Sequence, residues 1–537
     1  MCLVKVAVQG CCHGELTNIY NALPSKVDLL IICGDFQAIR NERDMDTMNV
    51  PNKYKRLADF HEYYKGLKTA PVLTLFVGGN HESSSYMKEL KYGGWVAPNI
   101  YYLGEFGSVW FRGLQIGGLS GIFNRLSFQR NEIHDEKLPY DYSTLKTVYH
   151  VKPKNFLKMN LMNKDIDIAL SHDWPSEIEQ FGNVKQLIRK KPFFKADIEK
   201  GELGSPLNRF LIHYLEARYW FSAHLHVKFE AKIYPKDSKN YLDYLLKNCS
   251  LKADKEVLTK ELKDVSAKLD SEEISIDMDE NLEHVEKGQP LNTEEIVMDM
   301  DEEELLNKDE IVMDMDEKVL NTVAPFNSEE IPIHNPNIDN SRKVIIPSNR
   351  DEISIDMNED PKENSNQSTS SNLPTSPLRK KAKQESQYTS FLALDKCLPK
   401  RQFLQVLDIN IKSDNSNHPS VKYDGLMLSR RAVAINKVVE KYLENYGSQF
   451  RKLNMAKVIQ NPTQMTIVPE LLQMVDHEVK KVDTLPQSMF EISPNSFKPI
   501  APTSDTKIED IPLKYWGNNQ TDEYCRMFEI ENKNAGK

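Results

Sequence analysis

The sequence predicts an α/β fold for its first 240 residues. Two observations lead to this class: nearly continuous apolar runs of strand length, and polar, helix-like stretches that separate them. Apolar runs without alternation are typical of strands that are buried on both faces of a sheet. The predicted strands cover residues 4–8, 29–33, 72–77, 114–118, 166–170 and 219–222.

Side chains of the kinds that bind metal ions follow five of these predicted strands. The clusters read Gly10-Cys-Cys-His13, Cys33-Gly-Asp35, Gly79-Asn-His-Glu82, Ser171-His-Asp173 and Ala223-His-Leu-His226. In open α/β folds, ligands gather just beyond the carboxyl ends of the strands, where turns direct several side chains at one point. We therefore expect the five clusters to meet at one site.

The donor groups of these clusters suit a centre with two metal ions. Asp35 supplies a carboxylate that can bridge two cations, Asn80 a carbonyl oxygen and Cys11 a thiolate. Four imidazoles complete the set, from His13, His172, His224 and His226. Two cations about 3.5–4 Å apart can generate hydroxide at neutral pH and stabilise an in-line displacement at phosphorus. A lone buried histidine is more often a core residue than a ligand, so this prediction depends on the whole combination.

Charge divides the chain into unequal parts. Residues 1–240 hold 32 Lys and Arg against 26 Asp and Glu, a mildly basic balance that suits a polyanion but is within ordinary variation. Residues 241–384 hold 17 basic against 34 acidic residues and few aromatic side chains. Such a segment cannot bury enough apolar surface to offset its chain entropy, so we expect an acidic, disordered insertion at 250–385.

Ordered structure is predicted to resume near Tyr388. We expect strands at 391–399 and 403–409 and helices at 429–443 and 469–482. The predicted division is therefore a catalytic domain at 1–240, the insertion, and a C-terminal domain at 388–537 that packs on the first.

Two features of the insertion bear on partners and location. An acidic-aliphatic repeat begins at residues 272, 294, 309 and 351; it either docks on an unidentified protein or is a solvated repeat with no dedicated partner. The basic run at 379–383 is consistent with a nuclear localisation signal, so we expect a nuclear protein, with the cytoplasm as a further location. The seven irregularly spaced cysteines and the lack of a bilayer-length apolar run predict a soluble protein in a reducing compartment, without a membrane partner.

The order of the metal-type clusters resembles the pattern D-x-H, G-D, G-N-H-[DE], H, G-H-x-H of the calcineurin-like metallophosphoesterases. Cys11 stands where that family has its first aspartate, and Ala223 where it usually has glycine. The resemblance implies a sandwich of two sheets flanked by helices. It implies one metal site at Cys11, His13, Asp35 and His226, and the other at Asp35, Asn80, His172 and His224. It also implies that His81 protonates the leaving oxygen. Glu82 and Asp173 either orient histidines from outside the ligand set or are simple surface or capping carboxylates.

Further motifs are similar to the RNA lariat debranching enzyme family. They include Gly10-Cys-Cys-His-Gly-Glu-Leu16, Gly93-Gly-Trp-Val-Ala97, Ser171-His-Asp-Trp-Pro175 and Leu203-Gly-Ser-Pro206. The similarity is dense to about residue 235 and looser over 388–537. It implies hydrolysis of the 2′-5′ phosphodiester at the branch point of excised intron lariat RNA, which gives linear RNA for turnover. A thiolate at Cys11 favours Fe(II), Zn(II) or Mn(II), as one or two ions, over Mg(II).

Selectivity for a branch must come from the walls of the site. Splayed RNA bases are typically held by aromatic rings and by the planes of basic side chains. Residues 125–152 have this composition, so we predict a lariat-recognition loop there; an ordinary polar connection is the alternative. The candidate contacts are Phe128, Arg130, Tyr140, Tyr142, Lys146 and Tyr149, with Lys53, Tyr54 and Ser120 outside the loop.

Three other functions compete with this prediction. A protein phosphatase would carry Gly-Asp-x-x-Asp-Arg-Gly around Asp35, but the chain reads Gly34-Asp-Phe-Gln-Ala-Ile-Arg40. A 3′-5′ nuclease would use the same chemistry on another substrate. A non-catalytic scaffold would be expected to lose ligands or the acid, and none of the predicted residues is missing.

Overall fold

The computed structural model describes residues 3–164, 166–248 and 388–532. The predicted insertion, with its repeat and its basic run, lies outside the described residues. The described residues on either side of it form one compact unit. The α/β class and the two sheets flanked by helices are confirmed.

The first sheet has six strands in the order β12-β1-β2-β3-β5-β4. Their bounds are β12 (Leu404–Asn410), β1 (Leu3–Gln9), β2 (Leu29–Ile32), β3 (Thr74–Phe76), β5 (Ile100–Tyr102) and β4 (Gly94–Ala97). Strands β1, β2, β3 and β5 are parallel, and the two edge strands run antiparallel to their neighbours. The carboxyl ends of β1, β2 and β3 therefore share one edge of this sheet.

The second sheet has eight strands in the order β10-β11-β9-β8-β7-β6-β13-β14. Their bounds are β10 (Phe229–Ile233), β11 (Thr389–Ala393), β9 (Tyr219–Ser222), β8 (Ile168–Ser171), β7 (Leu114–Leu119), β6 (Phe106–Phe111), β13 (Leu426–Leu428) and β14 (Glu491–Ile492). Strands β11, β9, β8 and β7 are parallel. Their carboxyl ends again share one edge.

Side-chain alternation divides the buried residues into three layers. Val6 and Val8 of β1 point into the core between the sheets, where they meet residues such as Ile116 and Leu170 of the second sheet. Ala7, between them in the sequence, faces the opposite layer. This alternation is the two-residue period of a strand with helices on one face and a second sheet on the other.

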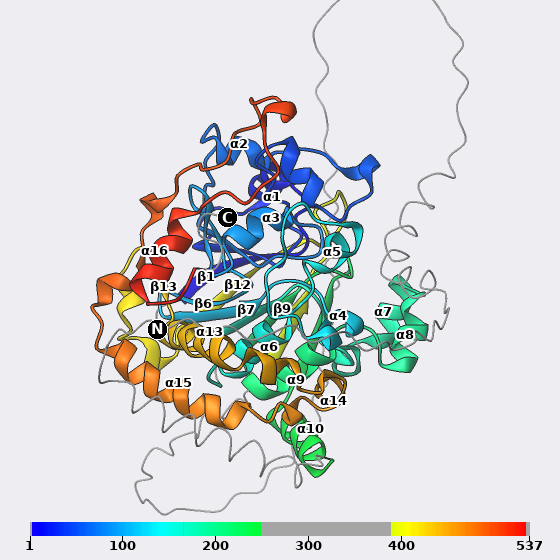
Figure 1. Ribbon diagram of the computed structural model, residues 1–537. Coiled ribbons are helices and arrows are strands. Elements are labelled where there is room, and N and C mark those ends of the chain that lie inside the picture. Colours follow the sequence, from blue (N-terminus) through cyan, green and yellow to red (C-terminus); the bar gives the residue numbers. More distant parts are fainter. Residues whose placement is uncertain (1–2, 165, 249–387, 533–537) are drawn as a thin grey trace, which may run out of the picture. The chain divides into compact units, whose positions relative to one another are not determined.

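Helices cover both outer faces (Figure 1). The first sheet is covered by α1 (Leu16–Ala22), α2 (Phe60–Tyr64) and α3 (Ser84–Glu89). The second is covered by α6 (Pro153–Asn160), α9 (Pro206–Leu215), α10 (Pro235–Lys247), α13 (Arg430–Arg451), α14 (Met455–Gln460) and α15 (Val468–Asp483). The remaining helices are α4 (Arg125–Arg130), α5 (Tyr142–Thr147), α7 (Val184–Lys190), α8 (Phe194–Lys200) and α16 (Asn519–Met527). Among the described residues, no helix is both long and apolar enough to cross a bilayer.

The segment after residue 388 contributes strands to both sheets. β12 pairs along the whole of β1, from Leu3 opposite Asn410 to Gln9 opposite Leu404. β11 lies between β9 and β10 in the second sheet. The C-terminal residues thus supply strands to the two sheets and helices that pack on them. Both sheets therefore combine strands from residues before 240 with strands from residues after 388.

Candidate metal centre

The five predicted clusters meet at the carboxyl ends of five strands. Cys11 and His13 follow β1, Asp35 follows β2, and Asn80 and His81 follow β3. His172 directly follows β8, and His224 and His226 follow β9. Three strands of one sheet and two of the other therefore place these side chains at one site.

Four of the seven predicted ligands have a left-handed backbone. The φ angles are 49° for His13, 46° for Asp35, 62° for His224 and 48° for His226. Non-glycine residues rarely adopt this conformation, and it concentrates at functional sites, where the surrounding structure enforces it. Here the left-handed turns come directly after the strands, where these four side chains meet at the centre.

Cys11, His13, Asp35 and His226 form the first cluster. One potential ligand atom from each of these four side chains lies within 4.8 Å of the others. His13 Nε2 is 3.2 Å from His226 Nε2 and 3.7 Å from Asp35 Oδ2. The backbone amide of His224 donates a hydrogen bond to Cys11 Sγ at 3.3 Å. A thiol, two imidazoles and a carboxylate at this separation suit one divalent cation.

Asp35 also reaches the second predicted group. Its Oδ1 lies 3.2 Å from His172 Nε2, which is 3.2 Å from Asn80 Oδ1. His172 Nδ1 donates to the carbonyl oxygen of Cys33 at 2.8 Å, which directs Nε2 toward Asp35. The His224 ring lies beside His172, with 5.0 Å between the ring centroids. The two carboxylate oxygens of Asp35 thus face different ligand groups, as expected of a bridging residue.

Two glycines make this close approach sterically feasible. A Cβ at Gly79 would lie 2.2 Å from Asp35 Oδ1 and 2.7 Å from His172 Nε2. A Cβ at Gly34 would lie 2.1 Å from His172 Nδ1, and Gly34 also has a φ of 115°. Since neither residue can carry a side chain without displacing a ligand, both glycines are part of the site.

Burial sets the protonation of the centre in the absence of a cation. It lowers the pKa of His13 and of His224 to about 3, so both imidazoles are neutral and able to coordinate. Burial disfavours the charged forms of Asp35 and His172 as well, but each stabilises the other's charge. The pKa of Asp35 is therefore lowered and that of His172 raised. Burial also raises the pKa of the Cys11 thiol, so a bound cation would be needed to hold the thiolate.

Glu82 positions two loops of the centre through their backbones. Its Oε1 accepts hydrogen bonds from the amides of Phe36 at 2.7 Å and Gly79 at 3.0 Å, and its Oε2 accepts from Gln37 at 2.8 Å. Glu82 was predicted to orient a histidine or to be a surface or capping carboxylate. It is buried, and these hydrogen bonds run to main-chain amides that flank Asp35 and Asn80.

Asp173 connects the centre to the segment that follows β7. Its Oδ2 accepts a hydrogen bond from the backbone amide of Phe123 at 3.2 Å. Gln37 was not among the predicted site residues, but it is buried and its Nε2 lies 3.4 Å from His13 Nδ1. Its position two residues after Asp35 was the only available signal.

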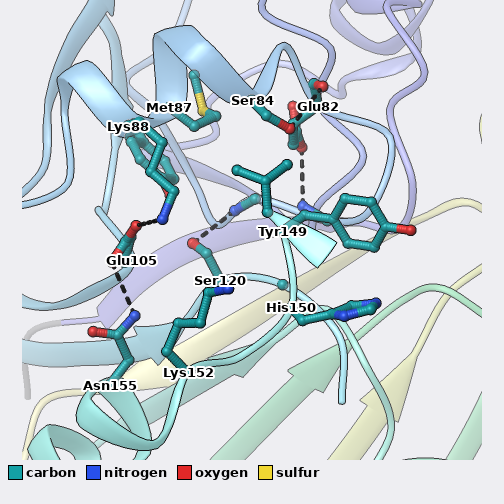
Figure 2. A pocket seen from close by; sticks show the side chains of 15 residues that line it. Glu82, Ser84, Met87, Lys88, Glu105, Ser120, Tyr149, His150, Lys152 and Asn155 are labelled. Carbon is teal, nitrogen blue, oxygen red and sulfur yellow. Dashed lines mark hydrogen bonds and ion pairs between the residues drawn. The ribbon is translucent and has the colours of Figure 1, made fainter. Parts of the chain in front are cut away.

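A pocket borders the centre on the side of Gly79 and Glu82 (Figure 2). Its two lysines pair with carboxylates: Lys88 with Glu105, which also lines the pocket, at 2.6 Å, and Lys152 with Glu136, outside the lining, at 2.6 Å. Asn155 donates to Glu105 at 2.9 Å, as the dashed lines in Figure 2 show. These pairs stabilise the pocket wall, and both of its lysines are ion-paired with carboxylates.

The predicted substrate contacts are spread around this pocket. Ser120 lines it, where its Oγ accepts from the amide of Gly78 at 2.9 Å and donates to the carbonyl of Gly104 at 2.6 Å. Tyr149 also lines it, at the end of the predicted recognition loop. The other candidates lie outside the pocket lining: Lys53, Tyr54, Phe128, Arg130, Tyr140, Tyr142 and Lys146.

The loop candidates outside the pocket differ in exposure. Tyr142 is 75% exposed and Arg130 is also exposed, whereas Phe128 is a buried core residue. The Tyr140 hydroxyl lies 2.8 Å from the hydroxyl of Tyr515, in the C-terminal part. The loop is therefore anchored at Tyr140, and the assignment of these side chains to RNA stays a prediction.

Comparison with known proteins assigns both halves of the structure. Residues 4–228 match the family model of calcineurin-like phosphoesterases, and residues 386–533 match that of the lariat debranching enzyme C-terminal domain. The chain therefore combines a calcineurin-like phosphoesterase region with a lariat debranching enzyme C-terminal domain. The second match covers β11 and β12, the C-terminal strands that join the two sheets.

Two lariat debranching enzymes illustrate the similarity. The chain is 53% identical over 235 residues to that of Homo sapiens, a match covering 42% of this chain and 43% of the human protein. It is 51% identical over 232 residues to that of Schizosaccharomyces pombe, covering 43% of this chain and 50% of the yeast protein. The chain thus spans half or less of the length of these relatives.

Proposed function

We propose that the chain hydrolyses the 2′-5′ phosphodiester bond at the branch point of lariat RNA and releases linear RNA. The observation that carries the proposal is a buried centre around Asp35 in a chain whose residues 386–533 match the lariat debranching C-terminal domain. A phosphoesterase fold alone would leave the substrate open. The C-terminal match favours branched RNA over other phosphodiesters.

The donors of the centre fit divalent cations. Cys11, His13, Asp35 and His226 would hold one ion, and Asn80, His172 and His224 would join Asp35 around a second. A thiolate among imidazoles favours Fe(II), Zn(II) or Mn(II) over Mg(II). When bound, one or two such ions supply a hydroxide nucleophile and compensate charge on the phosphoryl oxygens.

In this proposal, His81 delivers the proton to the leaving 2′-oxygen. Its ring is buried beside His13, with 5.5 Å between the ring centroids, and its backbone is tied to Asp35. Burial lowers the pKa of His81, whereas the charge of Asp35 acts in the opposite direction. A phosphate bound beside the ring would add negative charge and so favour the imidazolium, and a low intrinsic pKa then eases proton release.

The structure disfavours a protein phosphatase. The arginine nearest in sequence to the expected motif is Arg40, whose side chain is 1% exposed. Its Nε lies 2.9 Å from Asp44 Oδ2 and its Nη1 lies 2.8 Å from Glu89 Oε2. A guanidinium held by two carboxylates in the interior is not available to clamp a substrate phosphate.

The decisive experiment compares a short RNA with one 2′-5′ branch and its linear 3′-5′ counterpart. Metal-stripped protein receives Fe(II), Zn(II), Mn(II) or Mg(II) in turn, with Asp35→Asn as the matched inactive control. Cleavage only at the branch would support the proposal and identify the working metal. Cleavage of both RNAs would indicate a general nuclease, and cleavage of neither would indicate a scaffold.

We also propose nuclear localisation, supported by the basic run at 379–383, which lies outside the described residues. A fluorescent fusion in which Lys380 and Lys381 are replaced by Ala should lose nuclear enrichment. An unchanged distribution would contradict this proposal.

A further inference from the structure

The C-terminal part of the chain reaches the metal centre through β11. This strand lies parallel to β9, and its last residue, Ala393, is in register with Ser222, the last residue of β9. The segments that follow the two strands therefore leave the sheet at the same edge. His224 stands two residues beyond the end of β9, and Lys396 three residues beyond the end of β11.

The loop after β11 is fixed to the segment that carries Cys11. The amide of Cys397 donates to the carbonyl oxygen of Cys11 at 3.3 Å, and the amide of Gly10 donates to that of Phe403 at 3.0 Å. A Cβ at Gly10 would lie 2.1 Å from the carbonyl oxygen of Asp395. Lys396 therefore stands between two residues that touch the ligand segment, which places it at the rim of the centre.

The ammonium group of Lys396 has no acceptor among the described residues. Its neighbour Asp395 accepts from the backbone amide of Lys396 at 2.8 Å and pairs with Arg401 at 3.4 Å. Lys88 and Lys152 in the adjoining pocket are likewise paired with carboxylates. Lys396 is only partly exposed, so a cation is held at the rim without a counter-ion from the part of the chain that the structure describes.

The charge of Lys396 reaches the centre. Burial is the main cause of the lowered pKa of His13, His81 and His226, and the charge of Lys396 acts in the same direction. This agrees with the backbone contacts, which place Lys396 beside the segment that carries Cys11.

We propose that Lys396 binds a phosphate oxygen of the RNA beside His13 and His226. The inference rests on the proposed function, because a phosphodiester is the anion that must enter this centre. A lysine ammonium serves phosphate as a compact point charge with three donors. A branch nucleotide carries a second phosphodiester on the same ribose. The phosphate that Lys396 contacts is therefore either the scissile one or the neighbouring one at the 3′ position.

The test uses the full chain with Lys396→Met, which removes the charge and keeps the length of the stem, and with Lys396→Arg, which keeps the charge. Lys400→Ala is the matched control, since Lys400 lies in the same loop, is exposed and makes no ion pair with a described residue. We expect Lys396→Met to lower kcat/KM on branched RNA roughly ten- to hundredfold, with Lys396→Arg intermediate and Lys400→Ala unchanged. Metal content should equal that of the unmodified chain in all three.

Salt dependence of RNA binding separates a phosphate contact from a structural role. Loss of one phosphate contact should reduce the slope of log Kd against log salt concentration by about one for Lys396→Met. An unchanged slope together with unchanged kcat/KM would overturn the inference. So would a loss of activity that is fully explained by loss of metal.

A 2′-5′-linked dinucleotide without the 3′ phosphate locates the contact. An equal loss on this substrate and on branched RNA would assign Lys396 to the scissile phosphate, and a loss confined to branched RNA would assign it to the 3′ neighbour. If the unmodified chain cleaves no branched RNA, the proposed function fails. The inference is then tested by comparing Lys396→Met with Lys400→Ala in two measurements: the salt dependence of RNA binding and the cleavage of bis(p-nitrophenyl) phosphate. A difference in both would support the phosphate contact, and no difference would overturn it.

Discussion

The backbone amide of His81 donates a hydrogen bond to Asp35 Oδ1 at 3.0 Å. The predicted acid is therefore tied to the predicted bridging carboxylate through its main chain, and its imidazole is left for the substrate. This arrangement separates the two roles, because any side chain at position 81 retains the amide that orients Asp35.

His81→Ala should therefore abolish turnover and leave the metal content intact. Loss of general-acid catalysis typically lowers the rate by roughly 10²–10⁴-fold. Cleavage of branched RNA and the metal-to-protein ratio should be measured on the same preparation, with Asp35→Asn as the control that loses both. A loss of metal in His81→Ala would refute the assignment of this residue as the acid.

Gly79→Ala should disrupt the centre from a position that carries no ligand. The added methyl would overlap Asp35 Oδ1 at 2.2 Å, so either Asp35 or the Gly78–Glu82 turn must move. We expect metal affinity to fall at least tenfold, as for the loss of a residue that positions a ligand. Gly517→Ala is the matched control, because nothing lies within 4 Å of a Cβ there. Equal metal affinity in the two variants would show that the turn tolerates a side chain.

Cys11→Asp should shift metal preference toward harder cations. Replacing a thiolate by a carboxylate favours Mg(II) and Mn(II) relative to Zn(II) and Fe(II). Competition between Zn(II) and Mg(II) for metal-stripped protein would measure the change, and Cys33→Ser, beside the centre, is the comparison. An unchanged preference in Cys11→Asp would mean that this residue is not a ligand.

Much of the site could be predicted because ligands gather just beyond the carboxyl ends of strands in α/β folds. All seven predicted ligands lie at the ends of strands whose apolar runs are visible in the sequence. Helix α15 begins and ends within one residue of the predicted 469–482, and β12 within one residue of 403–409. Long periodic patterns and strands buried on both faces leave the clearest signals.

The remaining features depend on contacts between distant segments. Strands β4, β5 and β13 span only three or four residues and have no distinctive pattern. The strand predicted at 391–399 extends beyond the end of β11 at Ala393. The loop that carries Lys396 was therefore not recognised as a loop. The partnership of Tyr140 with Tyr515 joins residues far apart in the chain, and no local pattern reveals it.

Glu440→Gln should destabilise the junction between α6 and α13. Lys158 Nζ lies 2.6 Å from Glu440 Oε1, and the two side chains are 4% and 15% exposed. Removing one partner of a buried pair leaves the other charge without compensation, which typically costs ~3–5 kcal/mol. Urea denaturation at pH 7 should show this loss, and Glu523→Gln, on the exposed face of α16, should show almost none.

The same pair predicts how stability depends on acid. Burial opposes the charged form of Glu440, but Lys158 and Lys154 outweigh it and lower its pKa to about 2. The unfolded chain binds this proton near pH 4.3, so the contribution of Glu440 is complete above that pH and is lost as the pH falls toward 2. Glu440→Gln should flatten the decline in stability over this window. A decline as steep as that of Glu523→Gln would mean that the ion pair does not contribute to the acid sensitivity of the fold.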